Sequence, residues 1–98
     1  MTPTSQPTPD QAIQEAVRVL RAANPRISMA DAVTYATAWT EYVTADENIR
    51  ANGTVVAHPK TGAPITNPYL PVRADAMKRM ASVRGISADV LWQRRSGL

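Results

Sequence analysis

The chain has no cysteine, so a disulfide bond cannot stabilise it. Its only histidine, His58, has no thiolate or second imidazole with which to complete a tetrahedral zinc site. No stretch longer than a few residues is continuously apolar, and the N-terminus lacks the basic-then-hydrophobic order of a signal peptide. We therefore expect a soluble, unsecreted, intracellular protein without a structural metal.

Catalytic constellations are missing as well. The sequence contains no glycine loop of the kind that cradles phosphates, and His58 stands beside Pro59 in a turn without a sequence partner for a catalytic triad. Asp46 and Glu47 are adjacent, so on a helix they diverge by about 100° and are poorly placed to share a metal ion. We predict a protein that is not an enzyme and that uses no cofactor.

The length of 98 residues allows at most one domain. Residues 1–8 are rich in proline, serine and threonine and poor in apolar groups, so we expect them to be disordered. Residues 9–92 are predicted to form a single helical domain, and residues 93–98 a flexible basic tail. A domain this small buries only about 60 to 65% of its unfolded surface, and association with other copies is the remaining stabiliser.

The charge is unevenly distributed along the chain. Residues 1–49 carry three arginines against six carboxylates, whereas residues 50–98 carry eight cations against two carboxylates. The second half therefore has a net charge of +6, against −3 for the first half, within a total of +3. Such a segregated basic half is the electrostatic footprint expected of a surface that meets phosphates, although solubility alone explains any single lysine.

Helix signals account for most of the first half. Thr8-Pro9-Asp10 begins a helix with a hydroxyl cap and a proline at the first position, and Asn24-Pro25 ends it near Ala23. Ser28 and Asp31 begin a second helix, which no glycine or proline interrupts before Gly53. The second helix is therefore predicted to run to Asn52 and to be about 35 Å long.

The second helix has an apolar arc of about half its circumference, wider than the roughly 100° that one packing partner needs. Its stripe comprises Ala32, Ala36, Trp39 and Val43, with Tyr35 and Tyr42 on one flank and Met29 and Val33 on the other. Either a second subunit covers the extra width, or other helices of the same chain do. On the first alternative, the predicted oligomer interface comprises Tyr35, Trp39, Tyr42 and Val43.

From Asp46 onward the stripe of the second helix becomes charged, so we expect the last two turns of this helix to project from the core, with an Asp46–Arg50 ion pair.

The second half reads as an extended link followed by two helices. Residues 54–66 are β-branched and proline-containing around the turn Pro59–Gly62, which favours a small hairpin or paired extended segments. Asn67-Pro68 can begin a third helix, but Pro71 moves its expected regular start to about that residue. Gly85 ends it, and Ser87 is expected to cap a short fourth helix that docks Trp92 on the core. The predicted fold is mainly α, with one long central helix.

The order of these parts carries a resemblance. A long helix ending in Ile49-Arg50-Ala51-Asn52-Gly53, a short apolar link, Asn67-Pro68 opening a helix, and Arg84-Gly85-Ile86-Ser87 before a last short helix resembles the phage terminase small-subunit family. The resemblance covers about half of the chain. It implies a protein that recognises viral double-stranded DNA in the cytoplasm of the bacterial host, assembles into a ring, and delivers the DNA to a large subunit carrying the ATPase and nuclease.

Compared with longer relatives, the chain has little beyond Trp92 and only a short N-terminal run, so we expect DNA contact on the ring itself. The predicted phosphate contacts are Lys60, Arg73, Lys78, Arg79, Arg84, Arg94 and Arg95. Contacts of this kind give affinity that falls steeply with salt and little base specificity.

Two other classes of function remain open at this point. A small helix-turn-helix regulator would bind a palindrome as a dimer, and the two helices joined at residues 84–87 superficially fit that motif. A protein-interaction adaptor would use the basic half to meet an acidic protein surface and would have no affinity for DNA.

Overall fold

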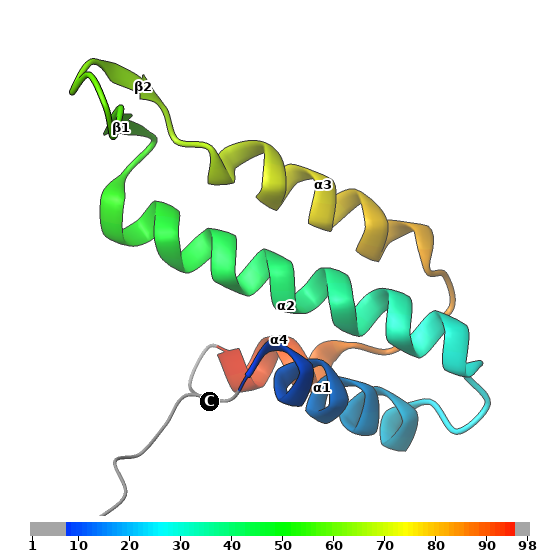
Figure 1. Cartoon of the computed structure of the whole chain (residues 1–98). Helices are drawn as coiled ribbons and strands as arrows, with labels where there is room; N and C mark the ends of the chain where they lie inside the picture. The colour runs from blue at the N-terminus through cyan, green and yellow to red at the C-terminus, as the bar shows by residue number, and fades with distance from the viewer. Residues whose placement is uncertain (1–7, 96–98) are drawn as a thin grey trace, which may run out of the picture.

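The computed structural model describes residues 8–95, which form four helices and one two-stranded sheet (Figure 1). The elements are α1 (Pro9–Ala23), α2 (Met29–Asn52), β1 (Val55–Ala57), β2 (Pro64–Thr66), α3 (Tyr69–Ser82) and α4 (Asp89–Arg95). This confirms the expected mainly α fold with a long central helix and a hairpin between α2 and α3. Apart from Thr8, the N-terminal segment expected to be disordered lies outside the described residues.

The first two helices begin and end where their caps predict. The Thr8 hydroxyl accepts the backbone N–H of Gln11, and the Gln11 side chain accepts the N–H of Thr8, which makes a complete capping box. The Ser28 hydroxyl accepts the N–H of Asp31 in the same way at the start of α2. Gly53 follows α2 with a φ of 87°, a conformation that side chains disfavour.

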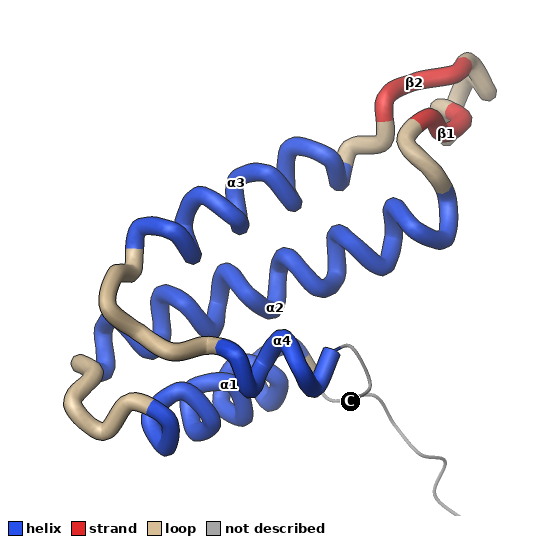
Figure 2. The backbone as a smooth tube through the Cα atoms, turned by 180° about the vertical axis from the view of Figure 1, so that it is seen from behind, coloured by secondary structure: helices blue, strands red, loops and turns tan. Residues whose placement is uncertain are grey.

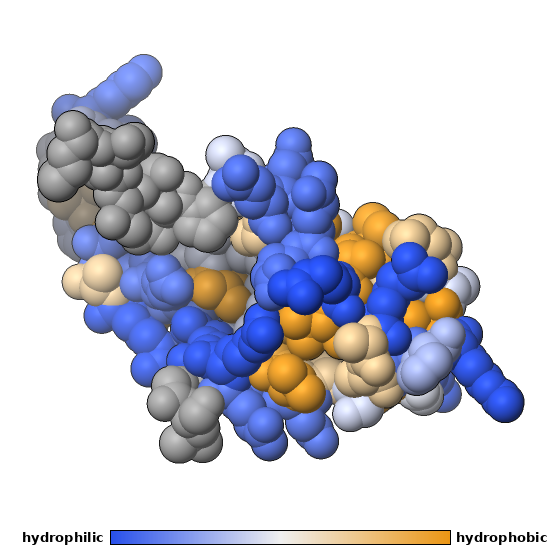
Figure 3. Space-filling view, turned by 90° about the horizontal axis from the view of Figure 1, so that it is seen from below, coloured by the Kyte–Doolittle hydropathy of each residue, from blue (hydrophilic) through white to orange (hydrophobic). Residues whose placement is uncertain are grey.

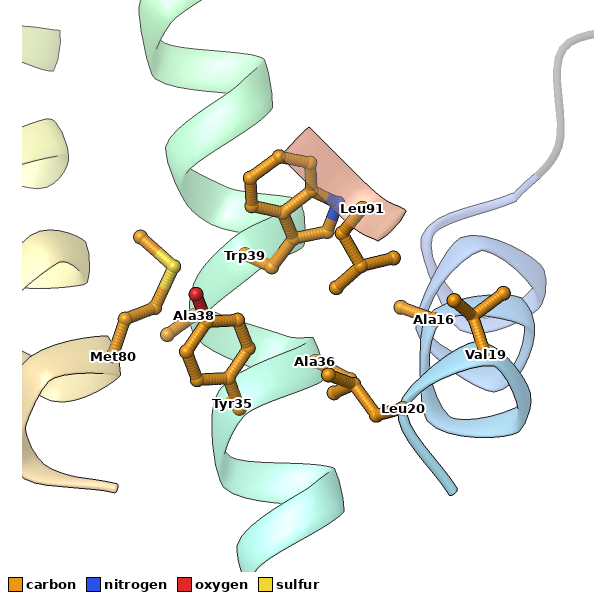
Figure 4. Close-up of a cluster of buried hydrophobic side chains, with 9 residues drawn as sticks. All are labelled: Ala16, Val19, Leu20, Tyr35, Ala36, Ala38, Trp39, Met80 and Leu91. Carbon is orange, nitrogen blue, oxygen red and sulfur yellow. The ribbon is translucent and has the colours of Figure 1, made fainter. Parts of the chain in front are cut away.

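Helix α2 is the central element, with α3 running back along one side and with α1 and α4 on the other side (Figures 1 and 2). Small residues of α2 let its neighbours approach closely, since Ala32, Ala36, Ala38 and Ala45 are completely buried. Figure 4 shows the core around Trp39, with Leu20 reaching it from α1, Met80 from α3 and Leu91 from α4. Three helices of the same chain thus cover the central stripe and the tyrosine flank of this apolar arc, whereas Met29 and Val33 on the other flank remain exposed.

Two of the four residues predicted for the oligomer interface lie inside the core of the single chain. Tyr35 is 7% exposed and Trp39 is 8% exposed, both inside the core of one chain. Tyr42 and Val43 are half-buried and pack against the same core. The sequence suggested a subunit contact because it does not reveal that the short helix α4 folds back onto this flank. Of these four residues, Tyr42 and Val43 are the two that keep exposed surface for a second copy.

Helix α4 covers the aromatic side of α2, and its Trp92 ring packs against the rings of Trp39 and Tyr42. The Trp92 ring meets the Trp39 ring edge-on, with centroids 4.6 Å apart, and lies 5.2 Å from the Tyr42 ring. Its indole N–H donates to the Tyr35 hydroxyl over 3.2 Å, so the expected docking of Trp92 on the core is confirmed. Helix α4 also extends to Arg95, and so includes the first three residues of the predicted tail. Residues 96–98 lie outside the described part of the chain.

Helix α3 begins two residues earlier than predicted and ends earlier as well. The Asn67 side chain accepts the backbone N–H of Tyr69, and Pro71 then falls in the first turn, where a missing N–H costs no helical hydrogen bond. Because Asn67 lies outside the helix, Pro71 does not delay the start of the helix. At the other end, Val83 is already extended, and Gly85, with a φ of 73°, belongs to the connection to α4.

Strands β1 and β2 form a true antiparallel hairpin, with Val56 opposite Ile65. The N–H of His58 donates to the carbonyl of Ala63, which closes the loop, and Asn67 anchors the base. The Asn67 side chain is buried and donates to both Asn48 Oδ1 and the Gly53 carbonyl. Both ends of the hairpin are therefore tied to the last turn of α2.

Candidate nucleic-acid interface

The basic half of the chain does not form one continuous patch, because its arginines divide between internal ion pairs and free surface. The largest cluster surrounds Asp46, which is only 3% exposed. Its carboxylate accepts Arg50 Nε and Arg73 Nη1, each at 2.8 Å, and also Arg95 Nη2. One carboxylate therefore joins α2, α3 and α4.

The arginines control the ionisation of Asp46. Burial by itself raises the pKa of this carboxyl group, but hydrogen bonds from Arg50, Arg73 and Arg95 outweigh it and lower the pKa to about 2. The carboxylate is thus charged throughout the physiological range. The predicted Asp46–Arg50 pair is confirmed, but the expectation that the last two turns of α2 project from the core is wrong. Ala45, Asp46 and Ile49 are buried there because α3 packs beside this part of α2.

Two further arginines predicted to contact DNA are held by carboxylates of the same chain. Arg79 lies between Glu41 and Asp75, at 2.7 Å and 2.9 Å, and these contacts, with Glu41 the stronger, raise the pKa of Arg79. Arg94 lies 3.1 Å from Glu15, whose pKa is lowered mainly by Arg18 and then by Arg94. Arg73, Arg79, Arg94 and Arg95 therefore join elements to one another, and their charges are largely offset locally.

The other three predicted contacts are exposed, and within residues 8–95 no ion pair involves them. Lys60 lies in the hairpin loop, Lys78 lies on the outer side of α3, and Arg84 follows the end of α3. They are spread from the hairpin along α3 to the far end of that helix (Figure 1). With about 1.5 Å of rise per residue, α3 alone spans roughly 20 Å, so these three cations are well separated from one another along the surface.

The opposite side of the molecule is mixed in character. Seen from the side of α1 and α4, hydrophobic residues reach the surface in patches surrounded by hydrophilic ones (Figure 3). Near this side a concavity of about 450 Å³ is lined by Tyr42, Trp92, Arg50, Arg95 and Glu47. Its position at the junction of α2 and α4 was not foreseen, and only the Asp46–Arg50 spacing signalled that charged side chains gather there.

Other kinds of site find no support in the described part of the chain. Among residues 8–95, no three histidine or carboxylate side chains gather in a way that could hold a metal ion. Within the same range, none of the helices combines the length and the hydrophobicity that a membrane span requires. His58, the one candidate base, instead accepts the N–H groups of Lys60 and Thr61 through Nδ1, and so stabilises the hairpin loop.

Comparison with family models decides the class. The model of the phage terminase small subunit matches residues 17–85, which include the C-terminal part of α1, all of α2, the hairpin and α3. The chain belongs to the phage terminase small-subunit family. This confirms the resemblance drawn from the residues around Gly53, Asn67 and Gly85.

For this terminase small subunit, comparison with curated proteins and with solved structures finds no match. Family membership implies a role in phage DNA packaging, and small subunits of the family are generally non-catalytic. The matched range ends at residue 85, so α4, which covers the aromatic flank of α2, lies beyond it. The packing of α4 therefore belongs to this chain's own structure and is not carried by the family match.

Proposed function

We propose that this chain binds viral double-stranded DNA as a ring-like homo-oligomer and presents it to the large terminase subunit. On this proposal the large subunit supplies the ATPase and nuclease, and the small subunit acts without catalysis in the cytoplasm of the bacterial host. The family match and the distribution of free cations support this function over the alternatives.

The observation that carries DNA binding is the separation of paired from unpaired cations. Lys60, Lys78 and Arg84 are exposed and are not neutralised by carboxylates within the described residues. They lie along the hairpin and α3, where a duplex could meet them in sequence. Because such contacts address phosphates, we expect binding to depend steeply on salt and weakly on base sequence.

Self-association is supported by apolar surface that the chain does not cover. Met29 is 52% exposed and Met77 is 51% exposed, in a chain without a disulfide that could compensate for a small core. Both residues lie on helices and not on loops.

The test is the solution mass of the full chain, measured by light scattering on size exclusion at low and high salt, with and without duplex DNA. The proposal predicts a closed oligomer well above a dimer that persists at high salt and co-elutes with DNA at low salt. A monomer that ignores DNA would overturn it and favour the adaptor function. A dimer with strong preference for a palindrome would overturn it in favour of a helix-turn-helix regulator.

A further inference from the structure

Helix α2 is covered on three sides, by α1, α3 and α4, and within residues 8–95 no element covers its fourth side. The side chains there form what we call the threonine face, which comprises Met29, Val33, Thr37, Thr40 and Thr44. Met29 and Val33 are 52% and 41% exposed. An uncharged strip of this length on the outside of a helix is unusual for a surface that meets only water.

The hydroxyl groups of this face are partly satisfied within the helix. Thr40 Oγ1 donates to the carbonyl of Ala36 over 2.9 Å, and Thr44 Oγ1 donates to the carbonyl of Thr40 over 3.1 Å. Because these donors already have partners, covering the face would leave neither of the two hydrogens unpaired. Thr40 and Thr44 can therefore be covered without losing a hydrogen bond of their hydroxyl groups.

A second incompletely covered surface lies between α3 and α4. Asp46 sets the register, because it binds Arg73 of α3 and Arg95 of α4. Met77 follows Arg73 by one helical turn and Trp92 precedes Arg95 by one turn, so both flank Tyr42, one turn before Asp46 on α2.

We call Tyr42, Met77 and Trp92 the aromatic groove. Met77 is 51% exposed and Trp92 is 37% exposed, while Tyr42 is half-buried between them. The concavity of about 450 Å³ beside Trp92 continues this groove towards Arg50 and Arg95. An apolar side chain from outside would find apolar walls here and cations at one end.

The two surfaces face in opposite directions. At about 100° per residue, Thr40 and Tyr42 point roughly 200° apart around α2. A contact between the threonine face of one copy and the aromatic groove of the next is therefore heterologous, and repeating it closes a ring if the rotation allows. A self-complementary contact would instead stop at a dimer.

The charges at the edges of the two surfaces are complementary. Beside the threonine face, Arg79 lies between Glu41 and Asp75, which leaves one negative charge. Beside the aromatic groove, three arginines surround Asp46 and Glu47, which leaves one positive charge. Arg50 is the most accessible of these arginines, with its side chain 76% exposed. Because the edges of the two surfaces carry opposite net charges, docking of the threonine face on the aromatic groove is favoured. Docking of two threonine faces, or of two aromatic grooves, is disfavoured.

We propose that a second copy of this chain docks its threonine face on the aromatic groove, and that this heterologous contact is the repeating interface of the oligomer. The inference rests on the proposed function in that it requires the chain to assemble. The inference adds to the proposed function which two surfaces form the contact between neighbouring copies, and that these two surfaces are different.

The experiment uses two full-length variants, each of which places a charge on one surface. Val33→Glu alters the threonine face and Met77→Glu alters the aromatic groove, both at sites exposed enough to accept a carboxylate in the folded chain. Val55→Glu is the matched control, because Val55 is 62% exposed on the hairpin and belongs to neither surface. Circular dichroism and thermal unfolding establish that each variant is folded, and light scattering gives the mass.

Each single variant is expected to run at the mass of one chain, 10.6 kDa, while Val55→Glu keeps the wild-type mass. Mixed in equal amounts, Val33→Glu and Met77→Glu each contribute one intact surface and should form a complex of two chains and no larger. Wild-type mass retained by both variants, or no complex in the mixture, would overturn the inference while leaving the proposed function standing. A wild-type protein that is itself a monomer would instead overturn the proposed function.

Discussion

Asn24 and Ser87, which are 63 positions apart in the chain, exchange two hydrogen bonds. Asn24 Nδ2 donates to the Ser87 carbonyl over 2.8 Å, and the Ser87 N–H donates to Asn24 Oδ1 over 2.7 Å. The residue that ends α1 thus fixes the segment from which α4 starts. The Ser87 side chain takes no part in this exchange, and the role of cap expected for its hydroxyl is not seen among the hydrogen bonds of the described residues.

This arrangement predicts opposite outcomes for substitutions at the two positions. Asn24→Ala removes both hydrogen bonds and should lower the free energy of unfolding by about 1–3 kcal/mol. Ser87→Ala keeps the backbone groups and should change it by less than about 0.5 kcal/mol. Urea unfolding followed by tryptophan fluorescence measures both. If both variants lost the same free energy of unfolding, the side-chain amide of Asn24 would not be the group that holds the two segments together.

A second prediction concerns pH. The folded pKa of Asp46 is about 2, below its ordinary value of 3.8, so its contribution to stability is complete above pH 4 and is lost as the pH falls through about 2. The loss is on the order of 2 kcal/mol. Urea midpoints measured between pH 6 and pH 2 should therefore converge for wild type and Asp46→Asn at the acid end. Curves that stay parallel over that range would contradict the role given to Asp46.

A third prediction addresses the base of the hairpin. Asn67→Ala removes the hydrogen bonds to Asn48, to the Gly53 carbonyl and to the N–H of Tyr69 at a site that is 1% exposed. We expect a loss of about 1–3 kcal/mol in stability and faster hydrogen exchange in β1 and β2. Asn52→Ala, at an exposed position nearby, is the control and should leave both quantities nearly unchanged. Unchanged exchange in Asn67→Ala would show that other contacts hold the strands.

A fourth prediction separates free from paired cations. Lys60→Gln, Lys78→Gln and Arg84→Gln should each weaken duplex binding and reduce the slope of log affinity against log salt by about 0.9 for each phosphate that the variant no longer neutralises. Arg79→Gln should leave that slope unchanged, because Glu41 and Asp75 already offset its charge. Fluorescence anisotropy of a labelled duplex at several salt concentrations gives these slopes. If the Arg79→Gln variant reduced the salt slope as much as Lys78→Gln, the separation into free and paired cations would be contradicted.

Local signals predict the helices of this chain well where a cap is followed by an uninterrupted apolar pattern. Thr8 and Ser28 mark the starts of α1 and α2, and Gly53 marks the end of α2. The start of α3 is predicted less well, because the effect of Pro71 depends on whether Asn67 is inside or outside the helix. The outcome is decided by the buried hydrogen bonds of Asn67 to the end of α2, which are tertiary contacts.

The candidate site is predicted from the sequence less completely than the helices are. Composition identifies the basic half, but it does not reveal which cations meet carboxylates distant in the sequence. Arg73 and Arg95 are 27 and 49 positions from Asp46, yet both bind it. In the same way, the burial of Tyr35 and Trp39 depends on the return of α4. Such pairings need the packing of the helices, and no local pattern encodes them.

The hairpin is attached to the core by two helices that run side by side, and its base is fixed to α2 by Asn67. Helix α2 has neither glycine nor proline between Met29 and Asn52, so it has no hinge. The base of the hairpin that carries Lys60 is therefore held in a fixed position relative to α2. Under the cyclic symmetry of the proposed ring, every copy would carry this lysine at the same height and the same radius, so the ring would present an evenly spaced circle of positive charge.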